Sequence, residues 1–451
     1  MTAISMSPEG ISREHLQSRS VRLSEVRKRF EDVLDRIIAR FPLEAENLAS
    51  LRSGKCRVIF VLGSPRGGTS FCKAKIAAEF GLASLPGEHR ALFTLLGRTF
   101  PDHGGCSEIG VGGALQLQER DFLLKGIGLD IAGPVTNDPS DEEISRYAHA
   151  WAMRITLQWV EMTFDIDAVI TLVENEVRAW YEVGNDDHND LSVAVLRALA
   201  VAYPQINPWL YDLNPALLGK AFAQRPRPEA PPSDLIVEIA PFVVPSLRRL
   251  RPLGDRPLIL KASSDAYRIA ELMHWFQSFE TDFIHVSRNP LASVNGLLDG
   301  WQHAGFWQHQ LSSLYEHAPV RPDLSNWKFD AFEGWDTGPQ NLSMIDLCVE
   351  QWRAPHLKIL ENCRFAHRIS FEHMIDPVLG LQVRDPLQRV LRLQPAVRKP
   401  QPLPPINATR PPKSARWRWR SDELLPILEK RSVRDLCKEL GYDLAAYQGW
   451  N

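Results

Sequence analysis

An apolar run that ends in a glycine-rich turn constrains the fold of this chain more than any other feature. Residues 56–62 (CRVIFVL) have the length and composition of a buried strand, and GSPRGGTS follows at residues 63–70. Residues 71–80 then have the pattern of a helix. A strand, a tight turn and a helix in this order aim backbone N–H groups and a helix N-terminus at one point. The sequence therefore predicts an anion site at this turn.

The spacing of the turn is close to that of the phosphate-binding loop G-x-x-x-x-G-K-[ST]. Gly63 and Gly68 occupy the two glycine positions, but Thr69 stands where the lysine would be. That lysine reaches the β- and γ-phosphates of a bound nucleoside triphosphate. We therefore expect a phosphate-type ligand other than ATP or GTP, with Arg66 as the cation.

A second strand, turn and helix follow at residues 281–294 (TDFIHVSRNPLASV). Arg288 comes directly after the apolar strand, and Asn289-Pro290 is a turn signal with Pro suited to the first position of a helix. Residues 257–261 (PLILK) form another short apolar strand, which ends in Lys261, and a helix is expected over residues 266–276. Alternating apolar strands and helices predict an α/β fold with a parallel sheet.

These segments resemble the sulfotransferases that use 3′-phosphoadenosine 5′-phosphosulfate (PAPS). Residues 64–70 (SPRGGTS) resemble the family's "PRSGTT/S" loop, which cradles the 5′-phosphosulfate, and residues 283–293 are similar to the family's 3′-phosphate segment. The resemblance implies a P-loop-like parallel sheet flanked by helices. It also implies transfer of a sulfuryl group from PAPS, without a metal, to a hydroxyl or alternatively an amine of a small-molecule or natural-product acceptor.

The resemblance implies specific cofactor-binding residues in both segments. Arg288 matches the arginine of the 3′-phosphate segment, but the position of its serine is taken by Gly296, so Ser293 is the candidate hydroxyl. Residues 413–420 (KSARWRWR) resemble the family's C-terminal closing loop, with Ala415 in place of its glycine and with Arg418 as a weaker candidate than Arg416. The implied cofactor-binding set is Arg66, Gly67, Gly68, Thr69, Ser70, Arg288, Ser293 and Arg416.

The resemblance also implies three catalytic residues: Arg66, Lys261 and Glu88. Lys261 resembles the lysine that touches the bridging oxygen and supports the leaving group. The bacterial and tyrosylprotein members with a glutamate base carry it about twenty residues after the loop arginine, and Glu88 lies at that distance from Arg66. His89 is the competing base. Neighbouring side chains rarely point the same way in regular structure, so we expect one of the two to face the cofactor.

Bulk composition excludes several other classes of function. The chain has 451 residues, 44% hydrophobic and 24% charged, with a net charge of −3, so no global basic field points to nucleic acid. Six cysteines without metal-ligand spacing predict reduced thiols and no metal site. No apolar run reaches the ~18 residues that a membrane span needs, and residues 1–9 do not resemble a signal peptide. We expect a cytoplasmic protein; nothing in the sequence indicates its oligomeric state.

The expected organisation is an N-terminal helical segment, residues 1–50, followed by a sulfotransferase domain, residues 51–451. Within that domain we expect a mostly helical, substrate-facing insertion over residues 106–232, a strand over 365–374, and a Pro-rich connector, basic loop and C-terminal helix over 395–451. Two alternatives remain: a P-loop kinase that uses ATP, and an inactive nucleotide-binding protein of the same fold.

Overall fold

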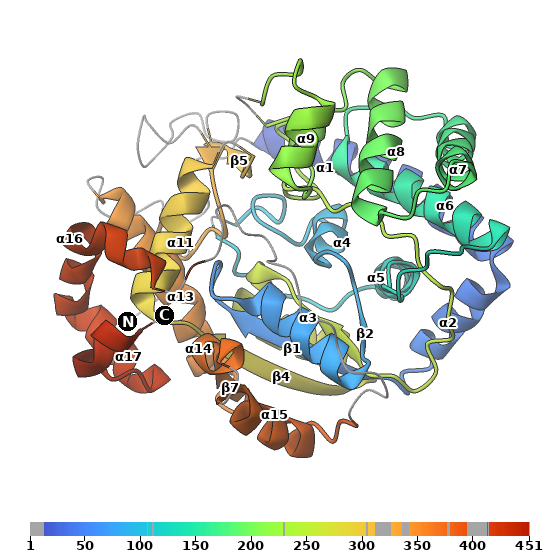
Figure 1. The fold of residues 1–451 in the computed structure, drawn as a ribbon. Coiled ribbons are helices and arrows are strands. Elements are labelled where there is room, and N and C mark those ends of the chain that lie inside the picture. Colours follow the sequence, from blue (N-terminus) through green and yellow to red (C-terminus); the bar gives the residue numbers. More distant parts are fainter. Residues whose placement is uncertain are drawn as a thin grey trace.

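The centre of the molecule is a five-stranded parallel sheet with the strand order β2-β3-β1-β4-β7 (Figure 1). The computed structural model describes residues 13–105, 107–110, 112–228, 231–303, 305–311, 326–335, 342–376, 379–394, 413 and 415–450. The sheet strands are β1 (Arg57–Gly63), β2 (Ala83–Ser84), β3 (Leu258–Leu260), β4 (Glu280–Ser287) and β7 (His367–Ser370). A separate antiparallel pair joins β5 (His309–Gln310) and β6 (Asn326–Trp327).

Strand β1 occupies the middle of the sheet because it is apolar on both faces. It pairs with β3 from Val58 opposite Leu258, and with β4 from Arg57 opposite Glu280 along its whole length. All of its residues after Arg57 are buried. A parallel strand of this kind must be covered by helices on both sides, which confirms the predicted α/β class.

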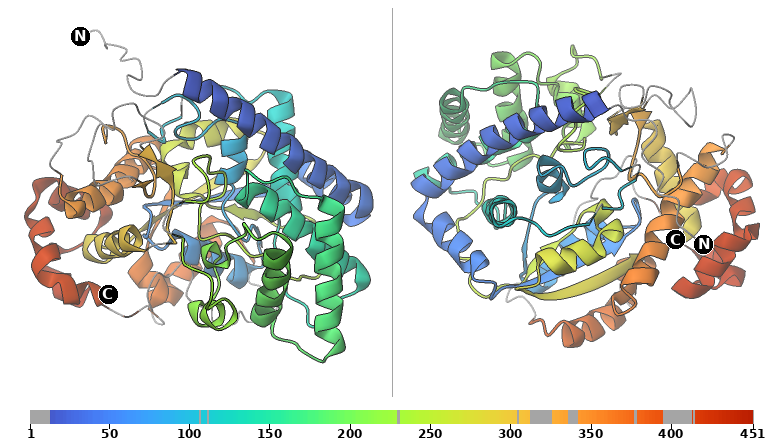
Figure 2. Two further views of the ribbon diagram at one scale, coloured as in Figure 1. Left: turned by 90° about the horizontal axis from the view of Figure 1, so that it is seen from above. Right: turned by 180° about the vertical axis from the view of Figure 1, so that it is seen from behind.

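The two faces of the sheet carry different helices (Figures 1 and 2). Ile59 and Val61 pack against α3 and α15, whereas Phe60 belongs to the large core on the opposite face. The helices are α1 (Arg13–Arg40), α2 (Pro42–Arg52), α3 (Thr69–Phe80), α4 (Arg90–Leu95), α5 (Leu117–Leu129), α6 (Asp141–Gln158), α7 (Ile166–Glu182), α8 (His188–Ala202), α9 (Pro215–Ala221), α10 (Ile269–Trp275), α11 (Pro290–Gln302), α13 (Met344–Asn362), α14 (Phe371–Ile375), α15 (Leu379–Val390), α16 (Ser421–Leu424) and α17 (Arg431–Leu440).

The described part of residues 106–232 is mostly helical, as the sequence predicts. Helices α5 to α9 lie in this range, and α6 begins at Ser140, whose Oγ accepts from the N–H of Glu143 at 3.2 Å. The N-terminal α1 packs along α6 and its apolar face joins the same core, so the N-terminal helices and the helical region share one interior (Figure 2).

Several boundaries differ from the expected ones. The predicted strand over 365–374 ends at Ser370, whose hydroxyl caps α14. The predicted final helix is divided by Pro426 into α16, a 3-10 turn and α17, and it ends at Gly441 as expected. The helix expected over 266–276 is a 3-10 turn (Ser263–Tyr267) followed by α10. The Pro-rich residues 395–412 lie outside the described residues. Within the described parts, no helix has the length and apolarity to cross a bilayer.

Candidate functional site

The turn between β1 and α3 has the conformation of an anion-binding loop. Arg66 (φ 61°) and Gly68 (φ 90°) both adopt the left-handed conformation, and the N–H of Gly67 donates to Ser64 O at 3.0 Å. A Cβ on Gly68 would lie 2.1 Å from the Phe371 ring, so only glycine fits. Because the N-cap residue Gly68 has no side chain, no side-chain cap competes with a ligand for the N-terminus of α3.

Three guanidinium groups meet at this loop. Arg288, which follows β4, donates from Nη1 to Arg66 O at 3.2 Å, and its guanidinium lies 4.7 Å from the centre of the Phe371 ring. Burial, followed by repulsion from Arg288 and Arg416, lowers the pKa of Arg66 to about 10. Like charges gathered in a partly desolvated space destabilise one another and favour a bound anion.

Arg416 reaches the loop from the far end of the chain. It starts a 3-10 helix (Arg416–Arg420) directly after Ala415, which has φ 49°, the left-handed conformation that glycine adopts most readily. Arg416 forms an ion pair with Asp299 of α11. Arg418, by contrast, is exposed and donates to Gln448 O. The closing-loop segment therefore places Arg416, and not Arg418, beside Arg66.

Three buried polar atoms near the two turns lack a hydrogen-bond partner within the described chain. Ser293 lies in the second turn of α11 and is fully buried, and its Oγ has no hydrogen-bond partner among the described residues. Ser64 Oγ and Arg288 Nε are likewise buried and unpartnered within the described chain. An unsatisfied buried polar atom costs about 1–3 kcal/mol, so these atoms fit a site that a polar ligand completes.

The structure gives a reason for glycine at position 296. A Cβ on Gly296 would lie 3.2 Å from the Cβ of Arg66, tighter than most real contacts. A serine at this position would press on the loop arginine. Ser293, one turn earlier on the same helix, is free of that conflict.

Lys261 and Glu88 form an ion pair next to the loop. Lys261 follows β3 and is buried, and its Nζ contacts Glu88 Oε1. Glu88 Oε2 accepts from the N–H of Ser263 at 3.2 Å, and the Glu88 side chain is 32% exposed. Burial alone would raise the pKa of Glu88, but Lys261 outweighs it, and the net pKa lies below the ordinary value.

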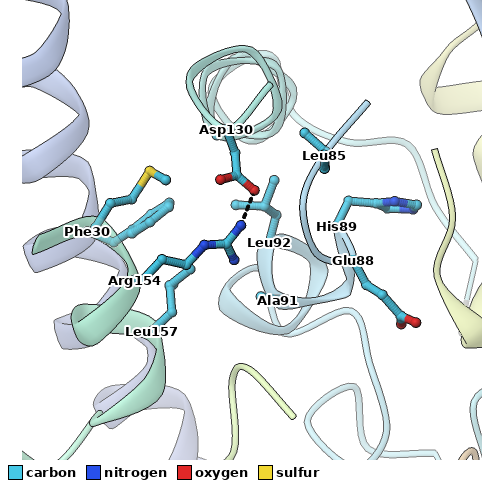
Figure 3. A pocket seen from close by; sticks show the side chains of 11 residues that line it. Phe30, Leu85, Glu88, His89, Ala91, Leu92, Asp130, Arg154 and Leu157 are labelled. Carbon is cyan, nitrogen blue, oxygen red and sulfur yellow. Dashed lines mark hydrogen bonds and ion pairs between the residues drawn. The ribbon is translucent and has the colours of Figure 1, made fainter. Parts of the chain in front are cut away.

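His89 points to a different place from Glu88. It is buried, with Nε2 3.1 Å from Asp265 Oδ1 and its ring against Phe60 and Phe93. Figure 3 shows a small cavity behind this turn, in which Arg154 pairs with Asp130. The Glu88 carboxylate is directed away from that cavity, and it is Glu88 that meets Lys261. Of the two candidate bases, only Glu88 contacts another predicted catalytic residue.

Two further residues belong to this site but were not predicted. Lys73 of α3 is buried and donates to Leu85 O at 2.7 Å and Gly87 O at 3.1 Å, and burial lowers its pKa to about 8. Asp330 is 2% exposed and accepts from Ser263 Oγ at 2.9 Å, and burial raises its pKa to about 7. Lys73 lies one helical turn after the loop, which was an available signal; nothing in the sequence around Asp330 singles it out.

Comparisons with known proteins add little to this picture. No protein-family model and no curated protein matches the chain. One solved structure, titled "Sulfotransferase Domain from the Curacin Biosynthetic Pathway", aligns over 86% of this chain and 99% of that chain, with 12% identity and a TM-score of 0.36. At this level the likeness decides nothing about chemistry. In the described ranges, no group of three His, Cys, Asp or Glu side chains is placed to hold a metal.

Proposed function

We propose that this protein is a sulfotransferase that moves a sulfuryl group from PAPS to a hydroxyl, or alternatively an amine, of a small-molecule or natural-product acceptor. The observation that carries the proposal is the meeting of Arg66, Arg288 and Arg416 at a glycine loop without the triphosphate-binding lysine. Three guanidinium groups suit a ligand with phosphate and sulfate groups at two separate points.

The residues around the loop fit such a ligand. Arg66 and the N–H groups of residues 67–70 would hold the 5′-phosphosulfate, with the Thr69 and Ser70 hydroxyls beside them. Arg288 and Ser293 would hold the 3′-phosphate, which satisfies the buried Arg288 Nε and Ser293 Oγ. Arg416 would close the site from the C-terminal segment.

The Lys261–Glu88 pair provides the proton chemistry. PAPS, when bound, would supply the sulfuryl group; in-line transfer forms a bond from sulfur to the acceptor oxygen and breaks the bond to the phosphate oxygen. Glu88 would take the acceptor's proton. Its lowered pKa keeps it ionised at neutral pH, and it becomes more basic when Lys261 turns to the leaving oxygen. Lys261 thus compensates the charge that develops on the leaving group.

Titration calorimetry with 3′-phosphoadenosine 5′-phosphate tests the cofactor directly. We expect micromolar binding that does not need Mg²⁺, with ATP weak under the same conditions. Arg288→Met should weaken binding about tenfold or more because a charged contact to phosphate is lost, whereas the matched control Arg418→Met should not.

Two results would favour the alternatives. Tight Mg²⁺-dependent ATP binding with no response to the bisphosphate would overturn the proposal in favour of a kinase. Bisphosphate binding with no transfer to any acceptor in a broad screen of alcohols, phenols and amines would point instead to an inactive nucleotide-binding protein.

A further inference from the structure

A second cluster of cations lies near the amino ends of the sheet strands, whereas the loop lies at their carboxyl ends. A pocket opens between α2 and the chain after α5, two elements that lie side by side in Figure 1, and residues 248–256 close it. Those residues lead directly into the amino end of β3, whereas the loop and Lys261 are at the carboxyl ends of the strands. The charged residues that line the pocket are Arg248, Arg249, Arg251, Arg256 and Glu44.

The carboxylate in this lining does not balance the cations. Glu44 Oε1 already accepts from Nε of the buried Arg146 at 2.6 Å, and Arg248 approaches the same oxygen only to 3.7 Å. Arg146 Nη1 is buried and has no hydrogen-bond partner in the described chain. Burial, followed by repulsion from Arg146, lowers the pKa of Arg248 to about 10. The buried Arg146 and Arg248, whose side chain is 15% exposed, thus share Glu44. Asp130 also attracts Arg248, but Asp130 is paired with Arg154.

A second pair of like charges borders the same pocket. Burial and the charge of Arg251 lower the pKa of Arg256. Among the arginines that line the pocket, Arg249 has a carboxylate partner of its own: its Nη1 lies 3.3 Å from Glu143 Oε2. The chain as a whole carries a net charge of −3, so this local excess of positive charge does not follow from composition.

The backbone that carries these arginines is held in place. Asn47 of α2 donates to Arg251 O at 3.1 Å and accepts from the N–H of Leu253 at 2.5 Å. The N–H of Arg249 donates to Pro134 O at 2.9 Å, and Glu143 Oε1 accepts from the N–H of Leu250 at 3.3 Å. The backbone of the residues that line the pocket is therefore fixed, so little backbone ordering is needed for a ligand to bind.

We propose that this pocket is a second anion site, which binds a tetrahedral oxyanion such as phosphate or sulfate, free or as an ester. Guanidinium groups match the geometry of these anions with paired hydrogen bonds. The site needs neither the glycine loop nor PAPS, so this proposal is independent of the proposed function.

Calorimetry with sodium phosphate, sodium sulfate and sodium acetate, at constant ionic strength, tests this site. The variants are Arg251→Gln, the double variant Arg251→Gln/Arg256→Gln, Arg66→Met for the glycine loop, and Arg431→Gln as the control, whose side chain is 95% exposed. We expect the wild type, Arg66→Met and the control to bind phosphate and sulfate more tightly than acetate. In the Arg66→Met background, where the glycine loop no longer contributes, the double variant should bind both anions about tenfold or more weakly than Arg66→Met alone. In the same background Arg251→Gln, whose side chain is exposed, should lie between the two.

Three results would overturn the proposal. These are an absence of phosphate and sulfate binding in the wild type, unchanged affinity in the double variant, and equal affinity for acetate. Binding that Arg66→Met removes and the double variant keeps would assign the anion to the glycine loop, which leaves the proposed function standing and this one refuted. Circular dichroism of each variant separates lost binding from lost folding.

Discussion

At the scale of single residues, Glu88 is stabilised in its ionised form by its neighbours. Lys261 contacts one of its oxygens and the Ser263 N–H contacts the other. These partners lower the pKa of Glu88, so the carboxylate is ready to accept a proton at neutral pH but is a weak base while Lys261 stays with it. In the proposed reaction, the pair would link proton acceptance to the movement of one ammonium group.

Replacement of this carboxylate should separate transfer from binding. Glu88→Gln keeps the size and the hydrogen bond from Ser263 but cannot accept the proton, so we expect turnover to fall by about 100-fold or more, the range typical of a lost general base. Affinity for 3′-phosphoadenosine 5′-phosphate, measured by calorimetry, should stay within about twofold. The exposed Glu423→Gln is the matched control. Turnover close to wild type in Glu88→Gln would contradict the role.

The sequence names candidate residues for the site but not the partners that surround them. It could not decide between Glu88 and His89, because the decision depends on Asp265, which becomes the partner of His89 only in the fold. The position of Lys73, one helical turn after the loop, is visible in the sequence, but its partners are backbone carbonyls, which only the fold brings together. The reason for Gly296, contact with Arg66, likewise exists only in three dimensions.

At the scale of elements, the C-terminal segment lies at the candidate anion site. A short 3-10 helix carries Arg416, and its start requires the left-handed Ala415. Asp299 on α11 binds both Arg416 and Arg420, which fixes this segment against the helix that also carries Ser293. Two elements far apart in the sequence thereby hold one side of the site together.

Removal of the Arg416 guanidinium should weaken cofactor binding more than it lowers the stability of the fold. Arg416→Ala should raise the apparent KM for PAPS about tenfold, because the site loses one of its three positive charges. Arg416 lies close enough to Arg66 and Arg288 to lower the pKa of both. Steady-state kinetics with Arg418→Ala as the control, together with the melting temperature of each variant, would check this. An unchanged KM would exclude the closing role.

Periodicity predicts whole elements well and their ends poorly. Helix α6 begins where the sequence has a start signal, a Ser140 cap followed by three acidic residues. Pro426 is a helix breaker, and it divides the C-terminal helical region. Ser370 ends its strand because its hydroxyl caps the next helix, a local competition that an apolar pattern does not reveal.

At the scale of the molecule, buried histidines make the fold sensitive to acid. His285 of β4 and His356 of α13 lie with Nε2 and Nδ1 2.8 Å apart inside the core. Burial lowers the pKa of His285 to about 3, and burial and His285 lower that of His356. The unfolded chain binds protons near pH 6.5 while the folded chain does not, so stability falls as pH drops below that value.

This pair gives a measurable pH dependence. Between pH 7.5 and 5.5 we expect the two histidines to reduce the free energy of unfolding by about 2–3 kcal/mol, as measured by urea denaturation. His356→Gln keeps a hydrogen-bonding side chain that cannot titrate, so about half of that decrease should disappear. An identical decrease in the variant would show that other groups cause it.

The position of β1 also has a consequence for synthesis. All of its residues after Arg57 are buried, yet its neighbours β3 and β4 come roughly 200 residues later, as the pairing of Val58 with Leu258 shows. At typical translation rates this delay lasts about 10–40 s. During that time the apolar strand β1 leaves the ribosome while neither of its edges is paired. Early helices or cellular chaperones must then keep β1 from associating with other chains.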